Sequence, residues 1–230
     1  MAWTLKNMPN VITVDGPSGV GKGTISEYLS EELKWNYLNS GALYRAIAWV
    51  VRNDSIVLKD TAGLESASKD IHFSLKNKKL LIKFEGMEIG SLIYNEEIAK
   101  IASKVSSNPK VRRSIVNIQR LFKKEPGLVA EGRDMGSVIF PESELKIFLT
   151  ASIETRAGRR YKQLKDREFN VSLPALIKDL SARDDRDKGR EISPLVIPDG
   201  AFVIETDDLT IIEVKKIVKE KVNKTYGTNI

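Results

Sequence analysis

The sequence contains no cysteine and a single histidine, His72, among its 230 residues. Without cysteine the chain can form neither a disulfide nor a thiolate metal site, and it has no cysteine nucleophile. One histidine argues against a histidine-based metal centre and against a Ser-His-Asp triad. Any chemistry must therefore come from lysine, arginine, aspartate and serine side chains.

Long apolar segments are also missing. The chain has no run of about 18 or more apolar residues, the length that would indicate a transmembrane helix. Its first ten residues, MAWTLKNMPN, lack the basic and apolar regions of a secretory signal. We therefore expect a soluble, cytosolic protein without a membrane partner. The length suits one α/β domain that carries a small insert.

The formal net charge of +6 indicates an anionic partner. The arginines gather in short clusters beside acidic residues and glycine, as in EGRD (131–134), ETRAGRR (154–160) and ARDDRDKGR (182–190). A nucleic-acid surface usually shows a basic stripe interleaved with aromatic residues instead. The distribution therefore predicts separate phosphate pockets for nucleotides and no nucleic-acid partner, although the charge alone would also suit an RNA-binding domain.

Hydrophobic periodicity predicts a parallel sheet with helical crossovers. VITVD (11–15) reads as a buried strand, and a glycine-rich turn joins it to an amphipathic helix over 24–34. WNYL (35–38) predicts the next strand, and helical spacing follows it up to Val51. An alternation of strand and helix is typical of a parallel sheet, in which ligands bind at the carboxyl ends of the strands.

From about residue 70 to residue 89 the hydrophobic period changes to two, which predicts a small antiparallel meander inserted into the α/β frame. The remaining segments resume the α/β pattern. They are predicted helices over 96–105, 111–122, 155–165 and 173–183, predicted strands over 128–130, 146–150 and 201–207, and a terminal helix that begins at a capping box of Thr210 and Glu213.

The segment GPSGVGKGT (16–24) fits the phosphate-loop pattern Gly-x4-Gly-Lys between a strand and a helix. Glycines let backbone N–H groups turn toward phosphate oxygens, the helix start adds its dipole, and Lys22 supplies a charge for the β and γ oxygens of ATP. The predicted ATP-binding residues of this loop are Gly16, Pro17, Ser18, Gly19, Val20, Gly21, Lys22, Gly23 and Thr24.

A phosphate loop is shared by kinases, GTPases and other ATPases. GTPases carry a DxxG switch and a base-reading NKxD motif, and neither is evident here. ATPases carry an apolar strand that ends in a Walker-B aspartate. The nearest match is LVA followed by Glu131, whose carboxylate could reach a metal ion. The loop alone therefore leaves open a nucleotide-dependent switch or an ATPase without a monophosphate acceptor.

With its Gly-Lys-Gly-Thr ending the chain resembles nucleoside monophosphate kinases, and three further motifs narrow the resemblance to bacterial-type cytidylate kinases. These motifs are NSGALYR (39–45), EGRDMGSVIFP (131–141) and RDDRDKGR (183–190), and the resemblance runs from about Val11 to Val203. Two positions depart from the family pattern, because the family usually reads DSGA and ADGRD where this chain has Asn39 and Glu131.

The resemblance implies a single P-loop kinase domain over 1–230. Its core would span 10–64 and 126–225, with a monophosphate-binding insert at about 65–105 and a helical lid at about 154–192. The implied reaction transfers the γ-phosphoryl of ATP to CMP and dCMP, with Mg²⁺ as cofactor, to give CDP or dCDP and ADP in pyrimidine nucleotide metabolism. Another kinase of this kind, for AMP, GMP, UMP or dTMP, is the nearest alternative. We expect a monomer whose partners are small-molecule nucleotides.

The resemblance also implies which residues bind the acceptor: Ser40, Arg45, Ser103, Arg112, Arg133, Asp134, Arg183 and Asp187. Cytosine offers an amine donor beside acceptor atoms, so Asp134 or Ser103 could accept from the base while Arg112 donates to it. The phosphate calls for arginine forks, which Arg45 and Arg133 could supply. Arg190 joins this group, because it lies four residues after Arg186, and two like charges at that spacing repel unless an anion sits between them.

For catalysis the sequence predicts Lys22, Arg159 and Arg183 as the charges that stabilise the transferring phosphoryl group. The segment 154–163 resembles the family's lid helix, and both Arg156 and Arg159 are predicted to approach ATP from it. Thr24 and Asp15 are predicted to hold Mg²⁺, directly or through water.

Overall fold

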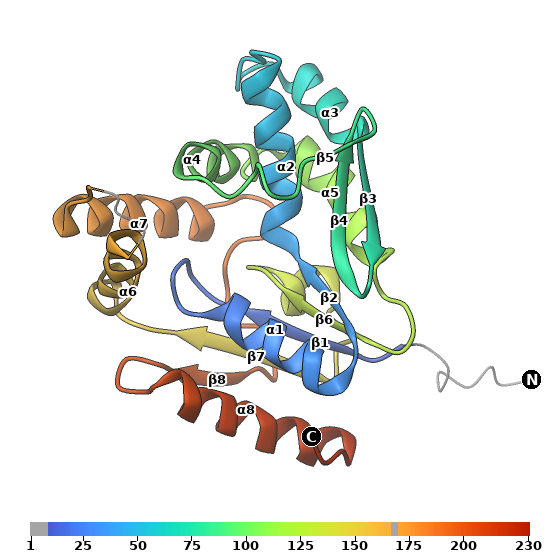
Figure 1. The fold of residues 1–230 in the computed structure, drawn as a ribbon, viewed down its shortest axis with the longest axis vertical. Helices are drawn as coiled ribbons and strands as arrows, with labels where there is room; N and C mark the ends of the chain where they lie inside the picture. The colour runs from blue at the N-terminus through green and yellow to red at the C-terminus, as the bar shows by residue number, and fades with distance from the viewer. Residues whose placement is uncertain (1–8, 167–169) are drawn as a thin grey trace, which may run out of the picture.

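Five parallel strands form the central sheet of the computed structural model, which describes residues 9–166 and 170–230 (Figure 1). Their order across the sheet is β2-β6-β1-β7-β8, and every neighbouring pair is parallel. The strands are β1 (Val11–Asp15), β2 (Asn36–Asn39), β6 (Leu128–Glu131), β7 (Leu145–Thr150) and β8 (Phe202–Glu205). The predicted parallel sheet is therefore confirmed.

Alternate side chains of the strands pack into two hydrophobic cores, one on each face of the main sheet. On one face, Ile12 and Val129 pack with the inner faces of helices α1 (Lys22–Leu33) and α8 (Ile211–Tyr226). On the other face, Val11 and Leu128 pack with α2 (Ser40–Asn53), α4 (Glu96–Val105) and α5 (Pro109–Arg120). The near-continuous apolar strands follow from this burial on both faces.

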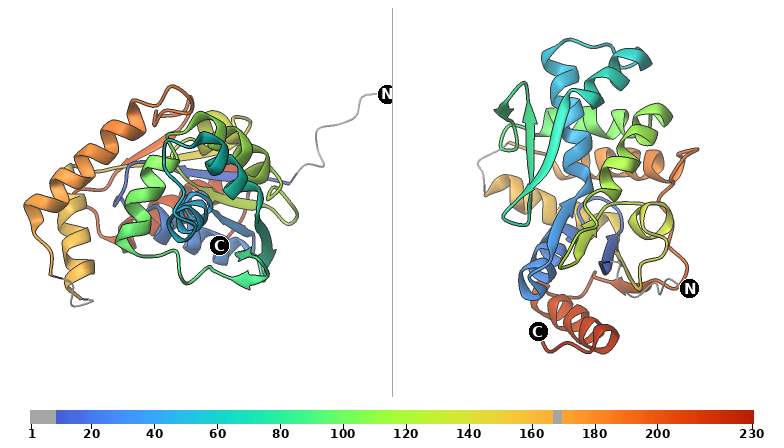
Figure 2. Two further views of the ribbon diagram at one scale, coloured as in Figure 1. Left: turned by 90° about the horizontal axis from the view of Figure 1, so that it is seen from above. Right: turned by 90° about the vertical axis from the view of Figure 1, so that its right-hand side faces the viewer.

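The predicted meander is confirmed as a second sheet of three antiparallel strands, β3 (Ile71–Lys76), β4 (Lys79–Phe84) and β5 (Met87–Glu88). Helix α3 (Thr61–Lys69), which the sequence pattern did not reveal, leads into it. Figure 1 and the right-hand view of Figure 2 place α3 and this sheet at the opposite end of the molecule from α8. The hairpin tip returns to the main sheet, where the Tyr37 N–H donates to the Lys78 carbonyl at 2.9 Å.

Two helices, α6 (Ile153–Lys165) and α7 (Leu173–Lys188), pack against each other beside the main sheet (Figure 1). Residues 167–169, inside the expected lid, lie outside the described residues. The sequence predicted that α7 would end near residue 183, but it continues to Lys188 because Asp184 and Asp187 are paired with arginines from other elements.

A π-helical turn, Met135–Ile139, follows β6 and was also absent from the sequence predictions. The capping box that begins α8 is confirmed: the Thr210 side chain accepts from the Glu213 N–H, and the Glu213 carboxylate accepts from the Thr210 N–H. Within the described residues, none of these helices is long and apolar enough to cross a bilayer.

Leu29 tests how far the placement of α1 depends on burial. Its side chain is fully buried between α1 and the sheet, so Leu29→Ala should lower the free energy of unfolding by about 2–5 kcal/mol, measured by urea denaturation. Ile212→Ala is the control, because Ile212 is 76% exposed and should change stability by less than about 0.5 kcal/mol. Equal effects of the two variants would contradict this account of the core.

Candidate active site

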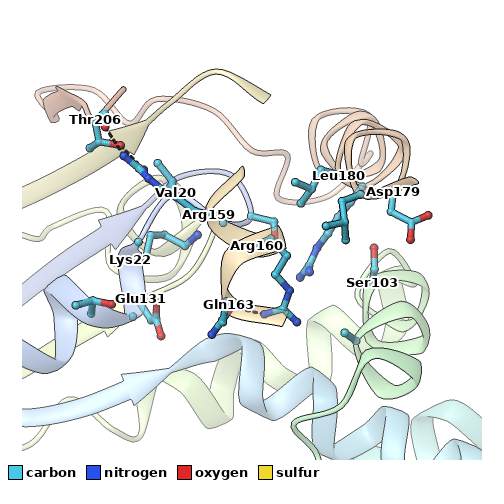
Figure 3. A pocket seen from close by; sticks show the side chains of 18 of the residues that line it. Val20, Lys22, Ser103, Glu131, Arg159, Arg160, Gln163, Asp179, Leu180 and Thr206 are labelled. Atoms are coloured by element: carbon cyan, nitrogen blue, oxygen red, sulfur yellow. Dashed lines mark hydrogen bonds between the residues drawn. The ribbon is translucent and has the colours of Figure 1, made fainter. Parts of the chain in front are cut away.

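A cavity of about 890 Å³ opens at the carboxyl edge of the main sheet (Figure 3). The phosphate loop and Glu131 border it on one side, and α4 and α7 border it on the other. A smaller cavity of about 60 Å³ adjoins it. Arg45 and Arg183 line both cavities, so the two spaces meet at these side chains.

The phosphate loop joins β1 to α1 as its sequence predicts. Gly16 has a φ of +145°, and a Cβ atom there would lie 2.1 Å from the Leu149 carbonyl oxygen, so no larger residue fits. Gly21 is the N-cap of α1 in the left-handed conformation. The loop residues that face the larger cavity are Ser18, Gly19, Val20, Gly21, Lys22, Gly23 and Thr24.

Lys22 is 7% exposed, and its ammonium donates to the Pro17 carbonyl at 2.7 Å. Burial lowers the pKa of Lys22 well below its usual value, and the charges of Arg133 and Arg183 lower this pKa further, while Glu131 opposes them. A buried cation beside two other cations is stabilised by anions. This end of the larger cavity is therefore suited to phosphate oxygens.

Asp15 and Thr24 were predicted to hold the metal, directly or through water, and of these two residues Thr24 lines a cavity. Both carboxylate oxygens of Asp15 accept backbone N–H groups, from Met135 at 3.0 Å and from Gly136 at 2.8 Å. Burial raises the pKa of Asp15 to about 7. The Asp15 side chain does not line either of the two described cavities. The Asp15 carboxylate thus ties the end of β1 to the backbone that follows Asp134, and its role toward Mg²⁺ stays a prediction. Thr24 does line the larger cavity, and its role toward Mg²⁺ stays a prediction.

Mg²⁺ fits this donor set as an ion carried mainly by the nucleotide. Residues 9–166 and 170–230 contain no group of three or more His, Cys, Asp or Glu side chains that could hold a metal ion alone. Mg²⁺ in kinases typically takes its ligands from phosphate oxygens, water and one or two protein oxygens. The Thr24 hydroxyl beside the loop could supply such an oxygen.

The acceptor residues predicted from the sequence converge on the smaller cavity. Eight of the nine line it, namely Ser40, Arg45, Arg112, Arg133, Asp134, Arg183, Asp187 and Arg190. The ninth, Ser103, lines the larger cavity, where its hydroxyl accepts from the Arg186 guanidinium at 3.3 Å. These nine residues come from six elements or loops, so their meeting depends on the fold and not on local sequence.

Two buried aspartates organise the arginines of the smaller cavity. Asp134 pairs with Arg112, and both are nearly inaccessible to solvent. Asp187 pairs with Arg133 at 2.8 Å and also with Arg190. Burial alone would raise the Asp187 pKa, but the neighbouring Arg133 and Arg190 lower it below its usual value.

Arg183, like Arg45, has no ion pair with a carboxylate among the described residues, where Arg45 donates to the Ile93 and Asn95 carbonyls. Burial lowers the pKa of Arg183, and the adjacent Arg133 lowers it further. Its buried Nε has no hydrogen-bond partner among the described residues. Because an unpaired buried cation is costly, an anion between the two cavities would stabilise it.

The three arginines of α6 differ in what they contact. Arg159 lines the larger cavity and donates to the hydroxyl of Thr206 at 3.0 Å, at the end of β8 (Figure 3). Arg160 pairs with Glu96 of α4. Arg156 was predicted to bind ATP, but it does not appear among the described cavity-lining residues.

Arg156 instead ties three segments together. It is 5% exposed, it pairs with Asp184 of α7 at 2.7 Å, and it donates to the Ser18 carbonyl of the phosphate loop at 3.1 Å. The phosphate loop also lies close to α6, because a Cβ atom added at Gly19 would be only 3.3 Å from the Cβ of Arg156. The Arg156 guanidinium thus holds the loop against the helices, and its contact with ATP stays a prediction.

Sequence reasoning missed Gln119 and Tyr37. The buried Gln119 donates to the Ser40 hydroxyl at 2.7 Å, and the Tyr37 hydroxyl donates to Glu131 at 2.6 Å. Gln119 carries no local signal, since a glutamine on an amphipathic helix usually faces solvent. The strand residue Tyr37 could have been found only by pairing β2 with β6 in register.

Comparison with known proteins gives a consistent result. A family model described as cytidylate kinase matches residues 12–224. A cytidylate kinase of Aeromonas salmonicida is 42% identical over 97% of this chain and 98% of its own length, and one of Coxiella burnetii is 44% identical over 96% and 94%. Among solved structures, an uncharacterized protein of Eubacterium ventriosum has a TM-score of 0.51 at 12% identity, covering 94% of this chain and 99% of its own, which supports the fold alone.

Arg156→Ala should test the tie between the loop and the helices. The change leaves the Asp184 carboxylate buried without its partner, so the free energy of unfolding should fall by about 3 kcal/mol in urea denaturation. The control is Lys162→Ala on the same helix, because Lys162 is exposed and should change stability little. An Arg156→Ala variant as stable as the Lys162→Ala variant would show that this ion pair does not hold the helices.

Proposed function

Because this chain belongs to the cytidylate kinase family, it is an ATP-dependent nucleoside monophosphate kinase that acts on CMP, and we propose that its two adjoining cavities bind the two substrates. ATP would occupy the larger cavity, with its phosphates on the loop. CMP would bind at the residues of the smaller cavity and extend into the larger one, because a space of about 60 Å³ does not hold a whole nucleotide. The observation that carries this assignment is the pair of arginines, Arg45 and Arg183, shared by both cavities.

On the ATP side, we assign phosphate binding to the loop from Gly16 to Thr24. Its backbone N–H groups at the start of α1 face the β and γ oxygens, and Lys22 adds a buried positive charge. Arg159 supplies a second charge from α6. Thr24 would hold Mg²⁺ from the loop, and the ion would neutralise part of the negative charge of the ATP phosphates.

On the CMP side, we assign the phosphate to Arg45 and Arg133, whose guanidinium groups face the smaller cavity. The Asp134–Arg112 pair would read the cytosine edge, with Asp134 accepting from the amine and Arg112 donating to the ring. Arg190, Asp187, Ser40 and Ser103 complete the lining. We also propose dCMP as an acceptor, because these phosphate and base contacts do not require the 2′-hydroxyl.

Transfer then depends on alignment and charge rather than on covalent catalysis. The acceptor phosphate is already an anion, so no general base is needed to activate it. Lys22, Arg159 and Arg183 would stabilise the charge on the equatorial oxygens as the phosphoryl group passes between the two sites. Arg183 suits this role because it lies where the cavities meet and has no carboxylate partner there in the described structure.

We propose that α6 and α7 act as the lid and the segment around the small antiparallel sheet as the monophosphate-binding insert. Lys100 of α4 pairs with Asp179 of α7 at 3.1 Å, and Arg160 of α6 pairs with Glu96 of α4. These exposed contacts are weak and can re-form as the helices move. We further propose that the chain acts as a monomer, because residues of one chain line both cavities.

Lys22→Ala tests the assignment of the loop. The variant should fold normally and lose kcat by roughly three orders of magnitude, because it removes a preorganised charge from the transferring group. Turnover is measured as ADP release with CMP, dCMP, UMP, AMP, GMP and dTMP as acceptors. Lys216→Ala, at an exposed position of α8, is the control. A folded Lys22→Ala variant that keeps more than about a tenth of wild-type turnover would contradict the assignment.

Asp134→Asn tests the reading of the base. Uracil reverses both hydrogen-bond polarities of cytosine, so each buried mismatch should cost about 1–3 kcal/mol and wild type should disfavour UMP by on the order of a hundredfold. An amide can rotate to donate to the uracil carbonyl. The variant should therefore lose CMP activity while its CMP-to-UMP preference in kcat/KM narrows about tenfold.

The control for this variant is Asp185→Asn, the same change at an exposed position of α7. If the preference stays unchanged while CMP activity falls in Asp134→Asn, the carboxylate serves to hold Arg112 rather than to read the base.

A further inference from the structure

Tyr37 and Glu131 form a hydrogen-bonded pair at the edge of the ATP cavity. The strands β2 and β6 run parallel, with Tyr37 opposite Val129 and Asn39 opposite Glu131. Because side chains two residues apart share a face of a sheet, Glu131 projects from the same face as Tyr37. The Tyr37 hydroxyl donates to Glu131 Oε1 at 2.6 Å.

The Glu131 carboxylate lies against the first turn of α1. A Cβ atom on Gly23 would sit 3.4 Å from Oε1 and 3.7 Å from Oε2, so both oxygens face the loop backbone next to Lys22. Figure 3 shows Lys22 and Glu131 on the same side of the cavity. The side chain is 6% exposed, and Tyr37 is the one hydrogen-bond partner of this carboxylate among the described residues.

Tyr37 is itself held from two directions. Its backbone belongs to β2, which pairs with β6, and its N–H donates to the Lys78 carbonyl at the tip of the β3–β4 hairpin. Next to this tip, Lys79 also contacts Glu27 of α1 at 2.8 Å, in an exposed ion pair. A hydroxyl on a rigid ring with a fixed backbone can set the position of a flexible glutamate.

The charge of Glu131 has a consequence for the nucleotide. The helix dipole stabilises a carboxylate at the N-terminus of α1, but the same place is where the triphosphate of ATP would bind. Two anionic groups at such a short range repel each other unless a cation lies between them. Lys22 supplies one positive charge, and a divalent cation carried by ATP supplies two more.

We propose that Tyr37 is a positioning residue that fixes the Glu131 carboxylate beside the phosphate loop, where it disfavours metal-free ATP and favours ATP that carries Mg²⁺. Tyr37 acts through Glu131 and does not itself touch the substrate. The inference rests on the proposed binding of ATP at the loop, and it adds a residue whose role neither the phosphate loop nor the acceptor site accounts for.

The test compares the affinity for ATP in excess Mg²⁺ with the affinity for ATP in EDTA, by isothermal titration calorimetry. Wild type should bind ATP more tightly with Mg²⁺. In Glu131→Gln the ratio of the two affinities should fall by about tenfold or more, because repulsion of metal-free ATP is lost. In Tyr37→Phe the ratio should fall by about threefold or more, and kcat should fall while KM for CMP stays unchanged.

A double variant separates positioning from a general structural role. Tyr37→Phe combined with Glu131→Gln should have the same ratio as Glu131→Gln alone, because Tyr37 has nothing left to position. Tyr28→Phe is the control: within residues 9–166 and 170–230 the Tyr28 hydroxyl forms no hydrogen bond, its ring lies under the Lys215 ammonium, and it does not line either cavity. It should match wild type in every measurement.

Glu131→Asp keeps the proposal testable if Tyr37→Phe does not fold. Aspartate keeps the negative charge but is one methylene shorter, so its carboxylate no longer reaches the Tyr37 hydroxyl. The variant should therefore show the same ratio of ATP affinities as Tyr37→Phe. Two results would overturn the positioning role. One is a folded Tyr37→Phe or Glu131→Asp variant whose ratio of ATP affinities with Mg²⁺ and with EDTA equals that of wild type. The other is a double variant in which the effects of the two single changes add. Failure of wild type to bind ATP under either condition would instead contradict the proposed function.

Discussion

Positive charge gathered around a buried space is the constraint on which the rest of this structure depends. Arg133 and Arg183 lower the pKa of Lys22, Arg133 also lowers the pKa of Arg183, and burial removes the water that would otherwise screen these charges. Two aspartates, Asp134 and Asp187, offset part of the charge through ion pairs. The remaining charge is stabilised by phosphate, so the same repulsion that is unfavourable in the free protein favours the binding of two nucleotides.

The fold is built to maintain this arrangement. The strands of the main sheet are buried on both faces, and their carboxyl ends present the loop, Glu131 and the acceptor residues at one edge. Helices from the insert and from α6 and α7 bring the other charges to that edge. Some of the contacts between these parts are polar, as in Arg156 with Ser18 and Gln119 with Ser40. They are directional contacts, which fix orientation as well as distance.

The sheet, the meander and the capped terminal helix could be predicted from the sequence, because each depends on local periodicity or on a cap within four residues. The acceptor residues could be named because a family resemblance supplied them, and the fold brings them together. The roles of Arg156 and Asp15 could not be deduced from the sequence. A charged residue near a nucleotide site can face the ligand or a buried backbone group, and the choice depends on neighbours that are distant in sequence, such as Asp184 for Arg156 and Met135 for Asp15. Tyr37 went unnoticed for the same reason.

The two N–H groups donated to Asp15 carry a consequence for how the enzyme keeps its substrates in register. Asp15 ends β1 directly before the phosphate loop, and its partners Met135 and Gly136 directly follow Asp134 of the acceptor site. One side chain thus joins the backbone before the phosphate loop to the backbone that follows Asp134. If the two substrates bind as proposed, this rigid contact sets the distance between them. Any movement of the outer helices would then only exclude water and bring charge to the site.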